Sequence, residues 1–367
     1  MNPMRVGLIG CGNISTVYFE AGGRFRDLQI VACADRDPAR AEAAAVRHAI
    51  PRVLDVANLP GDPEVDLVLN LTPPQAHTPV LRTAIAAGKH AYTEKPLGLS
   101  LAESISLLEQ AGAAGVTIGC APDTVLGAGI QTARKLIDDG WIGRPVSATA
   151  FMLCPGHESW HPDPAFYYAP GGGPLFDMGP YYLSALVTLL GPITQACAMT
   201  TAAASERIIT SEARFGQAVP VAVPTHVSGT LAFESGALAT LIMSFDAIGH
   251  SLPHLEIHGT EGSLQVADPN TFGGPIRLKR RGADAFADVP LSHTYASQSR
   301  GLGLAEMARA IQDGREPRAS ARMALHVLDC MEALHRSAGA RTFVSLATRC
   351  PRPEPMPMNL LEGGVDS

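Results

Sequence analysis

The stretch Met4-Arg5-Val6-Gly7-Leu8-Ile9-Gly10-Cys11-Gly12-Asn13-Ile14-Ser15 decides the fold of this 367-residue chain. Its apolar part, Val6-Gly7-Leu8-Ile9, is typical of a central strand in a parallel sheet. Gly10 allows a tight turn, and Gly12 has no side chain that would keep a pyrophosphate from the backbone. The helix that follows offers unpaired N–H groups and a partial positive charge to a diphosphate. We therefore predict a strand, a dinucleotide-binding turn and a helix.

A second apolar stretch, residues 29–34, ends at Asp35, about 20–25 residues beyond the first glycine. A carboxylate at this position accepts hydrogen bonds from an adenosine ribose and repels a 2′-phosphate. Arg36 follows directly and would have the opposite effect on a 2′-phosphate. The acidic residue favours NAD over NADP as the cofactor.

The composition limits the classes of protein to which the chain can belong. A net charge of −7 argues against nucleic acid as the main partner. No apolar run is long enough to span a bilayer, and the N-terminus enters the first strand with no room for a signal peptide. The seven cysteines form no C-x-x-C pair, which favours a reduced environment. We expect a cytoplasmic protein that binds neither membranes nor nucleic acid.

Strands and helices alternate over residues 1–122. We predict strands at 5–9, 29–34, 66–70, 90–93 and 117–120, with helices at 14–24, 38–48, 79–87 and 101–114. This alternation predicts an α/β fold in which helices cover both faces of a parallel sheet, here a Rossmann dinucleotide-binding domain.

The pattern changes from residue 123. Predicted strands at 146–153, 227–233, 237–245, 255–258, 263–266 and 276–280 accompany helices at 127–139, 178–190, 301–313 and 322–337. We expect residues 123–350 to form a substrate-binding and oligomerisation domain with an open antiparallel sheet. An exposed apolar sheet face needs a partner, so a homodimer or homotetramer is expected through that face. Residues 351–367 form a proline-rich tail, which we expect to be an extended or partly disordered arm.

Ligands of a parallel sheet bind beyond the carboxyl ends of its strands. Thr72 and Pro73 follow the strand 66–70 and are expected beside the dinucleotide. His77 begins the next helix, and it either points at the site or faces solvent.

The segment Glu94-Lys95-Pro96 follows the strand 90–93. A lysine at this point can direct its ammonium group at a bound substrate, and Pro96 restricts Lys95 to extended backbone geometry. The alternative is a surface lysine beside a loop proline.

The loop from 155 to 174 is rich in proline, glycine and aromatic residues, and long ordered loops are commonly functional. Trp160 and Tyr167 can pack against the C–H faces of sugars, and His157 can bind hydroxyl groups; alternatively, the aromatic residues only anchor the loop. Nearby prolines deny His157 and His161 a common helical face, so no metal site is expected.

Asp177 is predicted as the N-cap of the helix 178–190, with Tyr181 four residues later on the same face. The simpler alternatives are a plain helix cap at Asp177 and a half-buried core aromatic at Tyr181.

Taken together, these motifs resemble the Gfo/Idh/MocA oxidoreductases over nearly the whole chain. The residues that carry the resemblance are Gly10-Cys11-Gly12-Asn13-Ile14, Asp35-Arg36, Thr72-Pro73-Pro74 with His77, Glu94-Lys95-Pro96, Gly171–Gly179 and Thr260-Glu261-Gly262. The resemblance implies a Rossmann domain followed by a domain with a large, mainly antiparallel sheet. It implies cofactor contacts from Gly10, Gly12, Asn13, Ile14, Asp35, Arg36, Thr72, Pro73, His77, Glu94 and Lys95.

The resemblance also implies hydride transfer between nicotinamide and a secondary alcohol carbon of a sugar, glycoside, cyclitol or polyol. Lys95, Asp177 and Tyr181 would be catalytic and would contact the substrate together with His157, Trp160 and Tyr167. Most relatives carry histidine where Tyr181 stands, so either Lys95 or Tyr181 can move the proton. Two alternatives are a dinucleotide-binding regulator without turnover and an NAD-dependent enzyme that cleaves glycosides.

Overall fold

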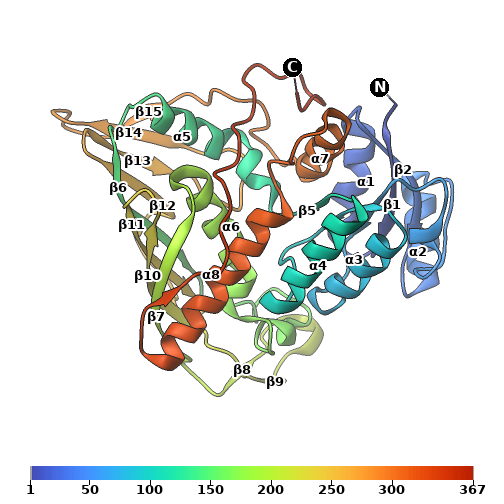
Figure 1. The fold of residues 1–367 in the computed structure, drawn as a ribbon. Coiled ribbons are helices and arrows are strands. Elements are labelled where there is room, and N and C mark those ends of the chain that lie inside the picture. Colours follow the sequence, from blue (N-terminus) through green and yellow to red (C-terminus); the bar gives the residue numbers. More distant parts are fainter. Residues whose placement is uncertain (1, 367) are drawn as a thin grey trace. The chain divides into compact units, whose positions relative to one another are not determined.

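The computed structural model describes residues 2–366, which divide into two compact units (Figure 1). The first unit contains the described residues up to Gln131, Leu291–Leu325 and those from Pro353 onward. The second unit contains Thr132–Pro290 and His326–Arg352. Each unit therefore combines segments that are far apart in the sequence, and residues 291–325 and 353–366 pack with the N-terminal part of the chain.

The first unit is built on a five-stranded parallel sheet with the strand order β2-β1-β3-β4-β5. Its strands are β1 (Met4–Ile9), β2 (Leu28–Ala34), β3 (Leu67–Asn70), β4 (His90–Thr93) and β5 (Ile118–Cys120). The helices between them are α1 (Ser15–Arg24), α2 (Pro38–His48), α3 (His77–Ala86) and α4 (Leu101–Ala114). The predicted parallel sheet is confirmed, and most element boundaries agree within a residue.

A single parallel bridge between Cys33 and Val53 adds a rudimentary strand beside β2. The backbone N–H of Cys33 donates to the carbonyl of Arg52, and the N–H of Leu54 donates to the carbonyl of Cys33. The strand order changes direction between β1 and β3, and in such sheets this switch point is where a dinucleotide binds.

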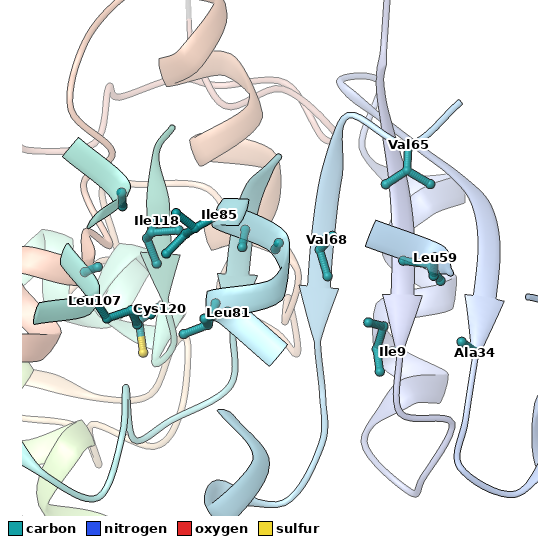
Figure 2. Packing of buried hydrophobic residues seen from close by; sticks show 14 of the residues in the cluster. Ile9, Ala34, Leu59, Val65, Val68, Leu81, Ile85, Leu107, Ile118 and Cys120 are labelled. Carbon is teal, nitrogen blue, oxygen red and sulfur yellow. The ribbon is translucent and has the colours of Figure 1, made fainter. Parts of the chain in front are cut away.

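The core on one face of this sheet lies under α3 and α4 (Figure 2). Leu81 and Ile85 of α3 and Leu107 of α4 pack with Val68 of β3 and Ile118 of β5. Helix α1 packs against β2, and α7 (Leu302–Asp313) packs against β5. Most residues of the five strands are buried under these helices, and in sheets of this kind ligands bind beyond the carboxyl ends of the strands.

The second unit contains a nine-stranded mixed sheet with the order β15-β14-β13-β12-β6-β11-β10-β7-β16. The strands are β6 (Pro145–Leu153), β7 (Ile193–Thr201), β10 (His226–Phe233), β11 (Leu238–Ser244), β12 (Leu255–Gly259), β13 (Gly262–Val266), β14 (Ile276–Arg280), β15 (Ala287–Val289) and β16 (Val344–Ser345). All neighbours are antiparallel except β6 and β11, which run parallel. The predicted large, mainly antiparallel sheet is confirmed.

Helix α6 (Gly173–Leu190) packs on the centre of this sheet, against β6, β10 and β11. Two further helices are α5 (Ala128–Asp138) and α8 (Ala321–Ala340), and β8 (Glu206–Ile208) pairs with β9 (Ala218–Pro220) in a small separate sheet. Strands β7, β8, β9, β15 and β16 were not predicted from the sequence.

The C-terminal segment is extended and is held to the first unit. Tyr295 donates its hydroxyl to the carbonyl of Gly364 at 2.5 Å, and Met356 donates its N–H to the side-chain oxygen of Gln131 at 2.8 Å. Arg315 pairs with Asp366 at 2.5 Å. The segment therefore has fixed partners close to its end.

Candidate active site

The glycine turn after β1 has the shape that a diphosphate requires. Gly10 has a φ of +103°, and a Cβ there would lie 2.8 Å from the carbonyl carbon and oxygen of Leu71. A Cβ on Gly12 would meet nothing within 4 Å, so the backbone is open at that point. Ser15 closes the turn, since its N–H and its hydroxyl both donate to the carbonyl of Gly12, at 3.0 and 2.7 Å. The turn and the start of α1 therefore fit a dinucleotide.

Asp35 lies at the end of β2 beside this turn. One carboxylate oxygen accepts the N–H of Cys11 at 2.7 Å, and the other accepts the N–H of Asp37 at 2.9 Å. The acidic residue therefore also holds the glycine turn in place, while Arg36 is exposed. The contact of Asp35 with a ribose stays a prediction.

His77 joins the loop after β3 to the loop after β4. Its side chain is fully buried, with Nδ1 2.6 Å from the carbonyl oxygen of Pro96 and Nε2 2.8 Å from that of Thr72. The solvent-facing alternative is therefore wrong. Both partners only accept hydrogen bonds, so a neutral ring satisfies one at a time and a protonated ring satisfies both. Burial opposes protonation and lowers the pKa of His77.

Asn70, the last residue of β3, shapes the same loop. Its side-chain oxygen accepts from the N–H and the hydroxyl of Thr72, at 3.2 and 2.7 Å, and its Nδ2 donates to the carbonyl of His77. Asn70 is fully buried, and the sequence analysis did not identify it. The available signal was an amide that ends an otherwise apolar strand.

Glu94 supports the segment that carries Lys95. It accepts the hydroxyl of buried Tyr18 at 2.7 Å and the N–H of Lys95 at 3.1 Å, and the Lys95–Pro96 peptide is cis. Tyr18 is a second supporting residue that the sequence analysis missed. The lysine itself is partly exposed, at the carboxyl end of β4.

In the second unit, the sequence-based position of Asp177 needs a correction. Helix α6 begins at Gly173 and its N-cap is Gly172, so Asp177 lies inside the helix and does not cap it. Pro174 explains the earlier start, because proline is well suited to the first turn of a helix. Asp177 and Tyr181 still lie one turn apart on one face, with Tyr181 buried and Asp177 partly exposed.

The loop before α6 brings predicted site residues together around Asp177. His157 Nε2 lies 3.6 Å from a carboxylate oxygen of Asp177. The His157 ring lies 4.0 Å from the ring of Tyr167 and 5.3 Å from that of Trp160. Trp160 remains 61% exposed, so it can offer an aromatic face to a ligand, whereas Tyr167 also anchors the loop.

A buried polar network supports this loop. Glu158 accepts the hydroxyl of Tyr168 at 2.6 Å and lies 3.5 Å from the guanidinium of Arg207. Arg207 also pairs with Asp246, which accepts the hydroxyl of Thr225 at 2.6 Å. The sequence analysis did not foresee this network, because its members come from separate loops and strands.

Lys95 belongs to the first unit, and Asp177, Tyr181, His157, Trp160 and Tyr167 belong to the second. The meeting of Lys95 with Asp177 stays a prediction. Within residues 2–366, no helix is long and apolar enough to cross a membrane. The same residues contain no group of three or more His, Cys, Asp or Glu side chains that could hold a metal ion.

Two family models match the chain in succession. One is described as "Oxidoreductase family, NAD-binding Rossmann fold" and matches residues 4–121. The other is described as "GFO/IDH/MocA C-terminal domain" and matches residues 130–265. Together they span both the glycine turn and the segment around Asp177.

Curated relatives and solved structures agree with these matches. A 1,5-anhydro-D-fructose reductase of Ensifer adhaerens is 28% identical over 320 residues, covering 86% of this chain and 90% of that protein. A D-xylose 1-dehydrogenase (NADP(+)) of Haloferax volcanii is 26% identical over 94% of this chain and 100% of that protein. The fold is similar to that of an NAD-binding oxidoreductase from Klebsiella pneumoniae, with a TM-score of 0.83, 23% identity and coverage of 95% and 100% of the two chains.

Proposed function

We propose a substrate class and residue roles for this chain, which belongs to the GFO/IDH/MocA family of NAD-binding oxidoreductases. The proposed reaction moves a hydride between a nicotinamide cofactor and a secondary alcohol carbon of a sugar, glycoside, cyclitol or polyol. The names of the relatives, a sugar-derivative reductase and a sugar dehydrogenase, support this class. The observation that carries it is the exposed indole of Trp160 on the loop whose His157 lies beside the Asp177 carboxylate.

We propose NAD as the preferred cofactor. Gly10, Gly12, Asn13 and Ile14 would hold the diphosphate, and the backbone left open at Gly12 fits it. The carboxylate of Asp35 at the end of β2 would bind the ribose and repel a 2′-phosphate, and Arg36 would flank it. Further contacts would come from Thr72, Pro73, His77, Glu94 and Lys95.

When bound, the cofactor accepts or supplies the hydride, and the protein supplies position and proton transfer. Lys95 would take the hydroxyl proton as an alcohol is oxidised, because a lysine near a cationic ring has a lowered pKa. Asp177 would orient that hydroxyl, and Tyr181 would hydrogen-bond the reacting oxygen and share the proton transfer. Trp160 and Tyr167 would pack on the carbohydrate ring, and His157 would lie beside its hydroxyl groups.

A screen of sugars, glycosides and inositols for NAD and NADP reduction tests this proposal. The expected result is reduced cofactor in stoichiometric amount with oxidised carbohydrate. Cofactor binding without turnover on any substrate would instead indicate a regulator. Release of an aglycone without net reduction would indicate a glycoside-cleaving enzyme.

A second copy of this chain is the proposed partner, in a homodimer or homotetramer formed in the cytoplasm. One face of the nine-stranded sheet exposes Met199 (81%) and Leu238 (53%), and Met199 lies in a cross-strand row with Ser228 and Ile242. A variant that carries Met199→Asp and Leu238→Asp should then be monomeric in sedimentation experiments. A wild-type chain that is monomeric at micromolar concentration would overturn this assembly.

A further inference from the structure

The ring of His157 is held in one orientation by aromatic neighbours. Its centroid lies 4.0 Å from that of Tyr167, 4.6 Å from that of Phe245 and 5.3 Å from that of Trp160. Tyr167 and Trp160 come from the same loop, whereas Phe245 follows β11. Closely packed rings leave little room for the imidazole to rotate.

The backbone beside His157 is also anchored. The carbonyl of Glu158 accepts the N–H groups of Thr210 and Ser211, at 3.0 and 2.8 Å. The carboxylate of Glu158 is bound by Tyr168 and Arg207. The position of the imidazole is therefore set by its ring contacts and by the anchored residue that follows it.

The anchored ring points one nitrogen at a carboxylate. His157 Nε2 is buried and has no hydrogen-bond partner among the described residues, and it lies 3.6 Å from Oδ2 of Asp177. This separation is slightly longer than a hydrogen bond but within the range of an ion pair. A buried polar nitrogen without a partner is costly, so closure of the remaining gap is favourable.

Other charged or titratable groups of the second unit lie around this pair. They are Cys154, Glu158 and Arg207, and Arg207 is paired with Glu158 and Asp246. The Glu158 carboxylate is likewise engaged by Tyr168. Asp177 is therefore the carboxylate that the His157 nitrogen faces.

We propose that His157 is a positioning residue for Asp177, whose carboxylate it keeps ionised and correctly oriented through a proton on Nε2. This inference rests on the proposed alcohol oxidation, in which Asp177 orients the reacting hydroxyl. A donor on a carboxylate stabilises its charged form and selects one rotamer. His157 then acts through Asp177, and its effect falls on turnover and not on cofactor binding.

The first test compares three variants by steady-state kinetics. His157→Phe keeps an aromatic ring in the cluster but removes the nitrogen, so kcat should fall roughly tenfold to a hundredfold while cofactor KM stays unchanged. His157→Gln restores an N–H donor and should recover much of the loss. His161→Phe is the matched control, because His161 lies on the same loop with its ring 5.5 Å from Tyr167, and it should keep wild-type kcat. Wild-type kcat in His157→Phe, or equal losses in His157→Phe and His161→Phe, would overturn the inference.

The second test does not depend on turnover. NMR spectra of nitrogen-15-labelled histidine in the full-length protein measure the ring-nitrogen shifts of His157 in the wild type and in Asp177→Asn. Removal of the facing carboxylate should move the Nε2 signal of His157, because that nitrogen lies 3.6 Å from Oδ2 of Asp177. Unchanged ring-nitrogen shifts, in a variant with wild-type thermal unfolding, would refute the pairing. If the wild type oxidises no carbohydrate, the proposed function fails, and these spectra still decide whether the two side chains interact.

Discussion

The imidazole of His77 lies 2.6 Å from the carbonyl oxygen of Pro96, nineteen residues further along the chain. Its other nitrogen lies 2.8 Å from the carbonyl oxygen of Thr72. A single buried ring therefore connects the loop that follows β3 to the segment that carries Lys95. Such a connection can set the direction of the lysine without contacting it.

Replacing His77 by Phe should destabilise the protein and misplace Lys95. The neutral ring donates to one of the two carbonyl groups at a time, so the variant removes one buried hydrogen bond, and a buried group left unsatisfied costs about 1–3 kcal/mol of unfolding free energy. We expect a lower urea midpoint and a reduced kcat. Wild-type values for both quantities would contradict the connecting role.

The same variant should change how stability depends on pH. Burial lowers the pKa of His77 below the value of 6.5 for an exposed histidine. The unfolded state then binds more protons, so this contribution to stability is complete above about pH 6.5 and is lost as the pH falls. Wild type should lose more stability than His77→Phe between pH 7 and pH 5 in urea titrations.

Two alanine substitutions in the glycine turn should affect different properties, one the stability of the fold and the other the binding of NADH. Gly10→Ala forces a side chain onto the backbone of Leu71 at positive φ, so it should destabilise the fold by at least about 1–3 kcal/mol. Gly12→Ala meets nothing in the protein, so unfolding should be unchanged while NADH binding weakens. Thermal unfolding and fluorescence titration with NADH separate the two effects. Unchanged NADH affinity in Gly12→Ala would argue against a diphosphate at this turn.

Lys95→Met should reduce turnover by at least about a hundredfold, a typical contribution of a general base, and should preserve cofactor binding. Lys135→Met is the control, because Lys135 forms a surface ion pair with Asp139. Near-wild-type turnover in Lys95→Met would mean that Tyr181 or another group carries out the proton transfer.

Asp35→Asn should shift the cofactor preference toward NADP. The amide oxygen can still accept the N–H of Cys11, which keeps the glycine turn in place, while the charge that repels a 2′-phosphate is lost. We expect the ratio of kcat/KM for NADP to that for NAD to rise about tenfold or more, since loss of one charge contact is worth about 1.4 kcal/mol or more. An unchanged ratio would assign cofactor selection to other residues.

Asp123 should make the first unit less stable as the pH rises. Burial raises its pKa to about 6, although its carboxylate accepts the N–H groups of Gly301 and Gly303 at 2.9 and 3.1 Å. The folded state therefore holds the proton more tightly, and the stabilisation present below about pH 4 is lost as the pH rises to about 6. The loss is on the order of 3 kcal/mol for two pKa units. Asp123→Asn keeps an acceptor and should remove this pH dependence of the unfolding free energy, measured by urea titrations. The control variant Asp139→Asn should leave the pH dependence unchanged.

Much of the first unit was predictable because its signals are local. The strands β1 to β5 are short apolar runs, and Gly10, Gly12 and Asp35 follow them at fixed offsets. The start of α6 was missed because Pro174 was assigned to the preceding loop, although proline also suits a first helical turn. Strand β7 was missed because its residues, Ile193–Thr201, include few large apolar side chains.

Periodicity, glycine turns and the acidic residue after the second strand were sufficient to predict an α/β fold with a dinucleotide site, because they express preferences of a few neighbouring residues, whereas the oxidoreductase activity was implied by the family resemblance. The partners of His77, His157 and Asn70 could be assigned only in the folded chain, since each contact depends on how strands and loops pack. The parallel pairing of β6 with β11 has the same origin, because it joins strands more than eighty residues apart. Contacts of this kind follow from burial and sheet register, which no short stretch of sequence contains.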